Sequence, residues 1–235
     1  MVNNVSILLT RANTIYQEEG LSALIKRVFA YAKYLISSVI SYENSTFYVY
    51  GQVVTQGNEV DYLPKIPNVT HTMIETIEQL NELAEKGYDL SLIDVNQARY
   101  RLQKGTIANL IFIDHEFGHI SWTALTEEAQ KTINRYPYKV DYENHETTSG
   151  ASWTNPKYRR QGLANYAVYK NRQFCIRKGA TTWRGIVLTD NFASMAWSDK
   201  LNSEIVAKAR YIRIFGLQFW KESSVKLENK KDNQP

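Results

Sequence analysis

The chain has 235 residues, of which 43% are hydrophobic and 22% are charged, a composition that predicts a soluble globular protein with one full core. Its formal net charge of +4 is small and the basic residues are dispersed, which argues against nucleic-acid binding. The single cysteine, Cys175, excludes an internal disulfide bond and is typical of a reducing compartment, so we expect a cytoplasmic protein.

The N-terminal region predicts an amphipathic helix and no secretory signal. The first ten residues lack a basic segment and a long apolar stretch, and Lys33 interrupts the most hydrophobic window before it could span a membrane. Residues 21–40 carry apolar side chains at a 3.6-residue period, with the basic residues off the apolar stripe. Such a helix packs on its own domain or on a second copy of the chain, which we favour, or lies in a membrane interface.

The next segments alternate between strand and helix patterns. Residues 46–54 are rich in aromatic and β-branched residues and predict the first strand. Two helices are expected to follow: one with Met73, Ile74, Ile77, Leu80 and Leu83 on a single face, and a second over residues 95–104. Residues 108–114 and 119–125 predict two strands joined by a turn that contains Gly118.

The second half predicts a strand–helix–strand unit. Residues 126–145 are polar and irregular, and we expect them to form a substrate loop. A strand over residues 147–154, a helix over 162–178 and a strand over 181–188 predict a parallel pair joined by a crossover helix. A short helix over 191–200 and a final antiparallel pair within 205–220 complete the chain.

The most informative stretch is Thr154–Ala164, which reads T-N-P-K-Y-R-R-Q-G-L-A. Pro156 cannot donate a hydrogen bond to a sheet and closes the preceding strand. Two arginines and a glycine then precede a helix. Free backbone N–H groups at a helix N-terminus, with the helix dipole behind them, form a site for a phosphate or pyrophosphate.

This spacing resembles the acyl-CoA pyrophosphate loop of the GNAT superfamily of acyl-CoA-dependent N-acyltransferases. The superfamily signature is Arg or Gln, two residues, Gly, one residue, then Gly or Ala, which falls here on Arg159, Gly162 and Ala164. The resemblance implies an α/β (α+β) fold with a mixed, centrally splayed sheet flanked by helices over residues 46–221. Residues 1–45 would then be an N-terminal helical extension, and residues 222–235 a polar, disordered tail.

The resemblance also implies a binding site for acetyl-CoA or another acyl-CoA, without a metal. The acyl arm would lie between two splayed strands, with its pyrophosphate on the helix N-terminus. The residues implied in coenzyme binding are Trp153, Thr154, Arg159, Arg160, Gln161, Gly162, Leu163, Ala164, Asn191 and Ser194.

Transfer to an amine requires a proton acceptor, for which Glu146 is our first candidate and His119 the second. Glu146 begins the first splayed strand, where many members of the superfamily carry a glutamate. Many members also carry a tyrosine acid in the short helix, but this chain has Ser198 at that position. A thiol with a pKa near that of cysteine, about 8.5, could leave without that acid.

His115-Glu116-Phe117-Gly118-His119 matches the H-E-x-x-H signature of zinc metalloproteases. On a helix the two histidines share one face and bind zinc, whereas on a strand they lie about 13 Å apart. The flanking residues are β-branched and aromatic, so we expect a hairpin and no metal site.

The sequence therefore predicts an acyl-CoA-dependent N-acyltransferase, with acetyl as the expected acyl group and a small-molecule or peptidyl amine as the acceptor. The alternatives are a non-catalytic acyl-CoA-binding module and, less favoured, a zinc hydrolase. An amino sugar, a polyamine, an antibiotic and a protein amine all remain open as acceptors.

Overall fold

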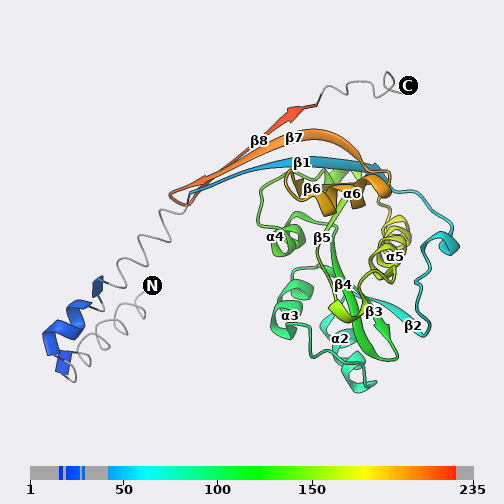
Figure 1. Ribbon diagram of the computed structural model, residues 1–235, viewed down its shortest axis with the longest axis horizontal. Coiled ribbons are helices and arrows are strands. Elements are labelled where there is room, and N and C mark those ends of the chain that lie inside the picture. The colour runs from blue at the N-terminus through cyan, green and yellow to red at the C-terminus, as the bar shows by residue number, and fades with distance from the viewer. Residues whose placement is uncertain (1–15, 18–19, 27, 30–41, 226–235) are drawn as a thin grey trace. The chain divides into compact units, whose positions relative to one another are not determined.

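The computed structural model describes residues 16–17, 20–26, 28–29 and 42–225 (Figure 1). The chain divides into two compact units: residues 1–45 with 211–219, and residues 46–210 with 220–235. Much of the predicted N-terminal helix, residues 27 and 30–40, lies outside the described residues, as do residues 226–235 of the predicted tail, whereas its residues 222–224 belong to a strand. No helix among the described residues is both long and apolar enough to cross a membrane.

The strands of the described residues form one mixed sheet of eight, in the order β2-β3-β4-β5-β6-β1-β7-β8. The strands are β1 (Glu43–Val53), β2 (Val69–Ile74), β3 (Ile107–Ile113), β4 (Glu116–Ala124), β5 (Glu146–Thr154), β6 (Thr182–Leu188), β7 (Glu204–Ile214) and β8 (Leu217–Ser224). From residue 42 to residue 225 the helices are α2 (Ile77–Glu85), α3 (Val95–Gln103), α4 (Glu127–Ile133), α5 (Leu163–Arg177) and α6 (Phe192–Lys200). Short 3-10 turns span Glu59–Tyr62, Tyr142–Asn144 and Pro156–Tyr158.

Helices cover both faces of the sheet around β3. Every residue of β3 is buried. Leu110 and Phe112 belong to a core that contains Leu80 and Leu83 of α2 and Leu102 of α3. Ile111 and Ile113, which point to the opposite face, pack with Leu163 and Ala167 of α5. A strand buried on both faces reads as a continuous apolar run, which is why residues 107–113 gave such a clear strand pattern.

Of the expectations for residues 46–145, two are wrong and one is confirmed. The strand that precedes the two helices is β2, which contains Met73 and Ile74, and α2 begins only at Ile77 behind a Thr76–Gln79 capping box. The first strand, expected over residues 46–54, is confirmed as β1, and it lies between β6 and β7 in the sheet. Residues 126–145 are not irregular throughout, because Thr126 caps α4 and Asp141 caps the turn at Tyr142–Asn144.

The hairpin turn between β3 and β4 also differs from expectation. The chain reverses at Asp114 and His115, whose φ angles are 47° and 70°, and Gly118 lies within β4. Ile111 pairs with His119 and Phe112 with Phe117, so Gly118 is the extra residue of a β-bulge. A Cβ on Gly118 would lie 2.4 Å from Cδ1 of Ile113, which explains the glycine.

The parallel pair, its crossover helix and the last elements are confirmed. β5 and β6 are parallel and α5 connects them. Asn202 follows α6 with a φ of 57°, so it adopts the left-handed conformation that glycine adopts more readily. In the smaller unit, Phe215 and Gly216 have positive φ angles, and β7 and β8 flank them.

Candidate active site

The parallel strands β5 and β6 separate after their first residues. Their backbones pair only at Glu146 with Thr182 and at Thr147 with Trp183. Beyond these two positions β5 pairs with β4, whereas β6 pairs with β1 along its whole length. The gap between β5 and β6 therefore widens toward their carboxyl ends, and the predicted splayed pair is confirmed.

A β-bulge lies in β5 beside this gap. Ile120 of β4 pairs with Trp153 and Trp122 pairs with Gly150, so Ser121 lies opposite two residues, Ala151 and Ser152. Ala151 has a φ of 46°, an unusual value for a residue with a Cβ. A bulge leaves a residue unpaired in the ladder, which makes backbone groups of β5 available at the widening gap.

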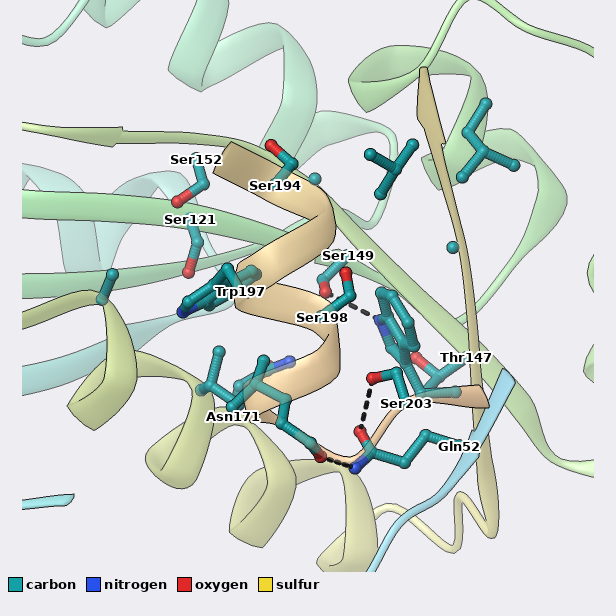
Figure 2. A pocket seen from close by; sticks show the side chains of 18 of the residues that line it. Gln52, Ser121, Thr147, Ser149, Ser152, Asn171, Ser194, Trp197, Ser198 and Ser203 are labelled. Atoms are coloured by element: carbon teal, nitrogen blue, oxygen red, sulfur yellow. Dashed lines mark hydrogen bonds between the residues drawn. The ribbon is translucent and has the colours of Figure 1, made fainter. Parts of the chain in front are cut away.

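The gap opens into a cavity of about 360 Å³. Residues 147 and 149–152 of β5 and residues 183 and 185–187 of β6 line it, together with residues of α5 and α6 (Figure 2). Hydroxyl groups are prominent among the lining side chains, which include Ser121, Thr147, Ser149, Ser152, Ser194, Ser198 and Ser203. The cavity is thus a polar cleft between the splayed strands.

The lining carries one strong positive charge and, among the described residues, no carboxylate. Burial lowers the pKa of His119 to about 4, and it raises the pKa of Cys175 to about 11 and that of Tyr138 to about 12. All three side chains are therefore neutral near pH 7. The charge belongs to Arg172, whose guanidinium donates to Gln52 Oε1 at 2.8 Å, to Leu201 O at 3.2 Å and to Tyr62 Oη at 3.2 Å.

His119 lies in the cavity wall, on β4. Its side chain is 1% exposed, and its Nδ1 is 2.7 Å from Thr154 Oγ1. Its Nε2 lies 3.5 Å from Ser152 Oγ, at the outer limit of a hydrogen bond. The imidazole is therefore neutral, held by β5 and placed at the open part of the cleft.

Glu146, our first candidate for the base, does not line the cavity. Its Oε2 accepts a hydrogen bond from the backbone N–H of Asp141 at 2.8 Å. Because Glu146 begins β5 in the paired section, it lies at the closed end of the gap. The structure thus associates this carboxylate with the connection before β5, whereas His119 belongs to the cleft.

The predicted pyrophosphate loop forms the entrance to α5. Gly162 has a φ of 88°, and no side chain caps the helix, so no side-chain acceptor occupies its first-turn N–H groups. Arg159 and Arg160 are exposed beside it, and Arg160 itself has a φ of 64°. Gln161 O accepts from Lys65 N at 2.8 Å, which ties the loop to the segment before β2. This is the uncapped, cation-flanked helix N-terminus that an anion requires.

The backbone conformation of Gly162 explains why this position is a glycine. A Cβ there would lie 3.5 Å from Cα of Pro64, at an ordinary contact distance. The residue needs glycine because of its positive φ.

The remaining predicted coenzyme residues lie in three different settings. Ala164 and Ser194 line the cavity from α5 and α6. Trp153 is exposed and stacks on Phe117, Thr154 bonds to His119, and Asn191 caps α6 by accepting from Ser194 N at 3.1 Å. Leu163 is buried in the core below the loop.

The H-E-x-x-H stretch spans a hairpin. His115 lies in the turn and stacks on Tyr88, Glu116 bonds to Tyr158 and Lys157, and His119 is buried in the cavity wall. The helical geometry that would place both histidines on one metal is therefore not present. Among the described residues no group of three His, Cys, Asp or Glu side chains is arranged to hold a metal ion.

Several cavity residues escaped the sequence analysis. Trp183 bridges the gap to Ser149 of β5, and Tyr138, together with Asn171 and Arg172 of α5, also lines the cavity. The sequence held one indication for Trp183, because an aromatic residue and a glycine two positions apart on a strand lie on the same face of the sheet. Tyr138 lies in the segment that we expected to be an irregular loop, so its register could not be assigned.

The strand order and the splayed, bulged parallel pair define a GNAT-like fold. No protein-family model matches the sequence, and no curated protein matches it. Similar solved structures include a tandem GNAT protein from the clavulanic acid biosynthesis pathway, at 12% identity and a TM-score of 0.48, covering 81% of this chain and 58% of that one. A GCN5-related N-acetyltransferase-like protein from Streptococcus suis has 16% identity and a TM-score of 0.42, covering 80% and 67%.

A GCN5-related glucosamine N-acetyltransferase region in a fungal β-N-acetylglucosaminidase has 8% identity and a TM-score of 0.47, covering 81% of this chain and 23% of that one. The chain thus spans less than two thirds of two of these three proteins. At these scores the likenesses carry no weight for function, and the fold assignment depends on the strand arrangement itself.

Proposed function

We propose that the protein is an acyl-CoA-dependent N-acyltransferase, with acetyl as the expected acyl group. The observation that carries this proposal is the polar cavity between β5 and β6, with the uncapped N-terminus of α5 following β5 in the chain. A phosphate site and a narrow cleft in this order suit a ligand with a pyrophosphate at one end of a long arm.

The residues of the cleft fit such a ligand. The N–H groups of the first turn of α5, with Arg159 and Arg160 beside them, would hold the pyrophosphate. The bulged section of β5, at Ala151 and Ser152, would hold the arm through backbone groups, and Ser194 would meet it from α6. When bound, the coenzyme supplies an activated acyl group as a thioester.

The chain's own residues would then position the amine and manage its proton. The neutral imidazole of His119 is the side chain in the cavity wall best suited to accept a proton near pH 7. Because its pKa is about 4, it is a weak base, so it would act on an amine that is already partly deprotonated or through water. Backbone N–H groups of the bulge would stabilise negative charge on the acyl oxygen.

A non-catalytic acyl-CoA-binding module is the second candidate. Two observations favour it: the absence of a carboxylate from the described cavity lining, and Ser198 at the position where many GNAT enzymes carry a tyrosine acid. Both would leave a binding site without strong acid–base groups.

Calorimetric titration with CoA and acetyl-CoA, followed by assays of thiol release with a panel of amines, tests the proposal. We expect both coenzyme forms to bind, and an amine-dependent release of thiol from acetyl-CoA. Binding without thiol release across amino sugars, polyamines, aminoglycosides and peptide amines would favour the binding module. If neither coenzyme form binds, both candidates are wrong.

A further inference from the structure

The side chain of Trp183 crosses the point where β5 and β6 separate. Trp183 forms the last backbone pair of the two strands, opposite Thr147. Its indole Nε1 donates a hydrogen bond to Ser149 Oγ, two residues further along β5, at 2.9 Å (dashed at Ser149 in Figure 2). The ring therefore spans the narrow end of the gap and is part of the cavity wall.

Gly185, two residues after Trp183 on β6, leaves room for the ring. A Cβ on Gly185 would lie 2.3 Å from Cη2 and 2.4 Å from Cζ2 of Trp183, distances that no real side chain tolerates. The indole thus lies over Gly185, in the space that a side chain at this position would occupy. The absence of a side chain at Gly185 leaves room for the ring, and the hydrogen bond to Ser149 holds it across the gap.

The position of the ring relative to the phosphate site gives it a function. β5 leads to the α5 entrance at its carboxyl end, whereas Trp183 lies at the other end of the gap, at the last backbone pair of the two strands. Thr154 and Ser149 are separated by five strand residues, or about 17 Å at ~3.3 Å per residue. An extended ligand with its phosphates at α5 and its arm along β5 therefore directs its far end, the acyl group, toward the indole.

We propose that Trp183 determines acyl-chain length: its indole closes the narrow end of the cleft, so that an acetyl group is accepted and a longer chain is excluded. This inference rests on the proposed function, because it assigns a wall of the same site. The ring blocks the direction in which a longer acyl chain would extend, and its hydrogen bond to Ser149 resists displacement.

The test measures binding of CoA, acetyl-CoA, butyryl-CoA and hexanoyl-CoA by calorimetry, in the wild-type protein and in Trp183→Ala. We expect the wild type to bind hexanoyl-CoA at least tenfold more weakly than acetyl-CoA. Trp183→Ala should remove this difference, so that the hexanoyl-to-acetyl affinity ratio rises at least tenfold, while the Kd for free CoA changes less than threefold.

Two further variants serve as controls. Trp183→Leu shortens the side chain but keeps an apolar residue in the strand. It should raise the hexanoyl-to-acetyl affinity ratio in the same direction as Trp183→Ala, and it replaces that variant if Trp183→Ala does not fold. Ser149→Ala removes the hydrogen bond but keeps the ring, so it should relax the length preference less than Trp183→Ala. Thermal unfolding monitors the fold of each variant.

The outcomes separate the two proposals. If the wild type and both Trp183 variants bind CoA but share one dependence on chain length, the assignment of Trp183 is overturned and the coenzyme site stands. If the wild type binds hexanoyl-CoA as tightly as acetyl-CoA, the assignment is equally overturned. If the wild type binds no form of CoA, the proposed function fails, and the inference fails with it.

Discussion

Nδ1 of His119 and Oγ1 of Thr154 are 2.7 Å apart, and the two residues also face each other in the β4–β5 register. The hydroxyl orients a ring that burial keeps neutral, since the pKa of His119 is lowered to about 4. The same contact connects the cavity wall to the strand that leads into the phosphate loop. His119 is therefore a test residue for both stability and activity.

Acid should destabilise the protein through His119. The folded-state pKa of about 4 lies below the unfolded value near 6.5, so the unfolded state binds the proton more readily. The free energy of unfolding is therefore highest above about pH 6.5, and it falls by an amount on the order of 3 kcal/mol as the pH decreases toward 4. Urea unfolding at pH 7, 6 and 5 measures this loss.

His119→Gln should make the pH dependence shallower over this window, because the variant cannot take up the proton. His71→Gln is a matched comparison, since burial also lowers the pKa of His71 to about 4. Each substitution should remove a similar part of the dependence. An unchanged slope in His119→Gln would show that another group is responsible.

Turnover should depend on His119 more than on Glu146. We expect His119→Gln to lower turnover by roughly 10²-fold, at the lower end of the range for losing a proton acceptor. Glu146→Gln should change it only a few-fold, because Glu146 does not line the cavity and glutamine can still accept from Asp141 N. Steady-state kinetics with acetyl-CoA compares them, and a large loss in Glu146→Gln alone would restore our first candidate.

Gly162 and Gly179 provide a matched pair at the two ends of α5. Their φ angles are 88° and 85°, so alanine at either position should cost about 1–2 kcal/mol in the free energy of unfolding. Only Gly162→Ala should also weaken CoA binding, because it disturbs the N–H groups at the start of the helix. Equal CoA affinities in the two variants would argue against a phosphate site there.

Ala151 tests the bulge in β5. Because its φ is 46°, Ala151→Gly should relieve backbone strain and stabilise the fold by about 0.5–1 kcal/mol, with coenzyme binding retained. Ala151→Val should destabilise the bulge and weaken acyl-CoA binding, since a β-branched residue tolerates positive φ poorly. Chemical denaturation and calorimetry together distinguish these effects, and stabilisation by valine would contradict them.

The N-terminal segment should mediate association. Leu21, Ile25, Val28 and Phe29 are each 47–73% exposed. We propose that residues 21–40 contact a second copy of the chain in preference to a membrane, so analytical ultracentrifugation should show a dimer that deletion of residues 1–41 abolishes. Salt-sensitive co-sedimentation with anionic liposomes, without self-association, would instead support the membrane.

Local patterns predicted the second half of the fold well. The Pro156 stop, the positive-φ glycine and the long helix are local features, and each one appeared where its residues indicated. The bulge at Ala151 and the Trp183–Ser149 bridge could not be predicted, because both depend on how β4, β5 and β6 align across the sheet. Likewise, nothing in residues 43–53 identifies β6 and β7 as the neighbours of β1.

The insertion of β1 between β6 and β7 has a consequence for synthesis. β1 pairs with β6 from Phe47 with Leu188 to Val53 with Thr182, so its partners leave the ribosome about 130–140 residues after it does. Such long-range pairing slows folding and leaves an aromatic, β-branched segment unpaired in the nascent chain. Ribosome-bound intermediates that end before residue 182 should therefore be protease-sensitive at residues 43–53 and should depend on chaperones.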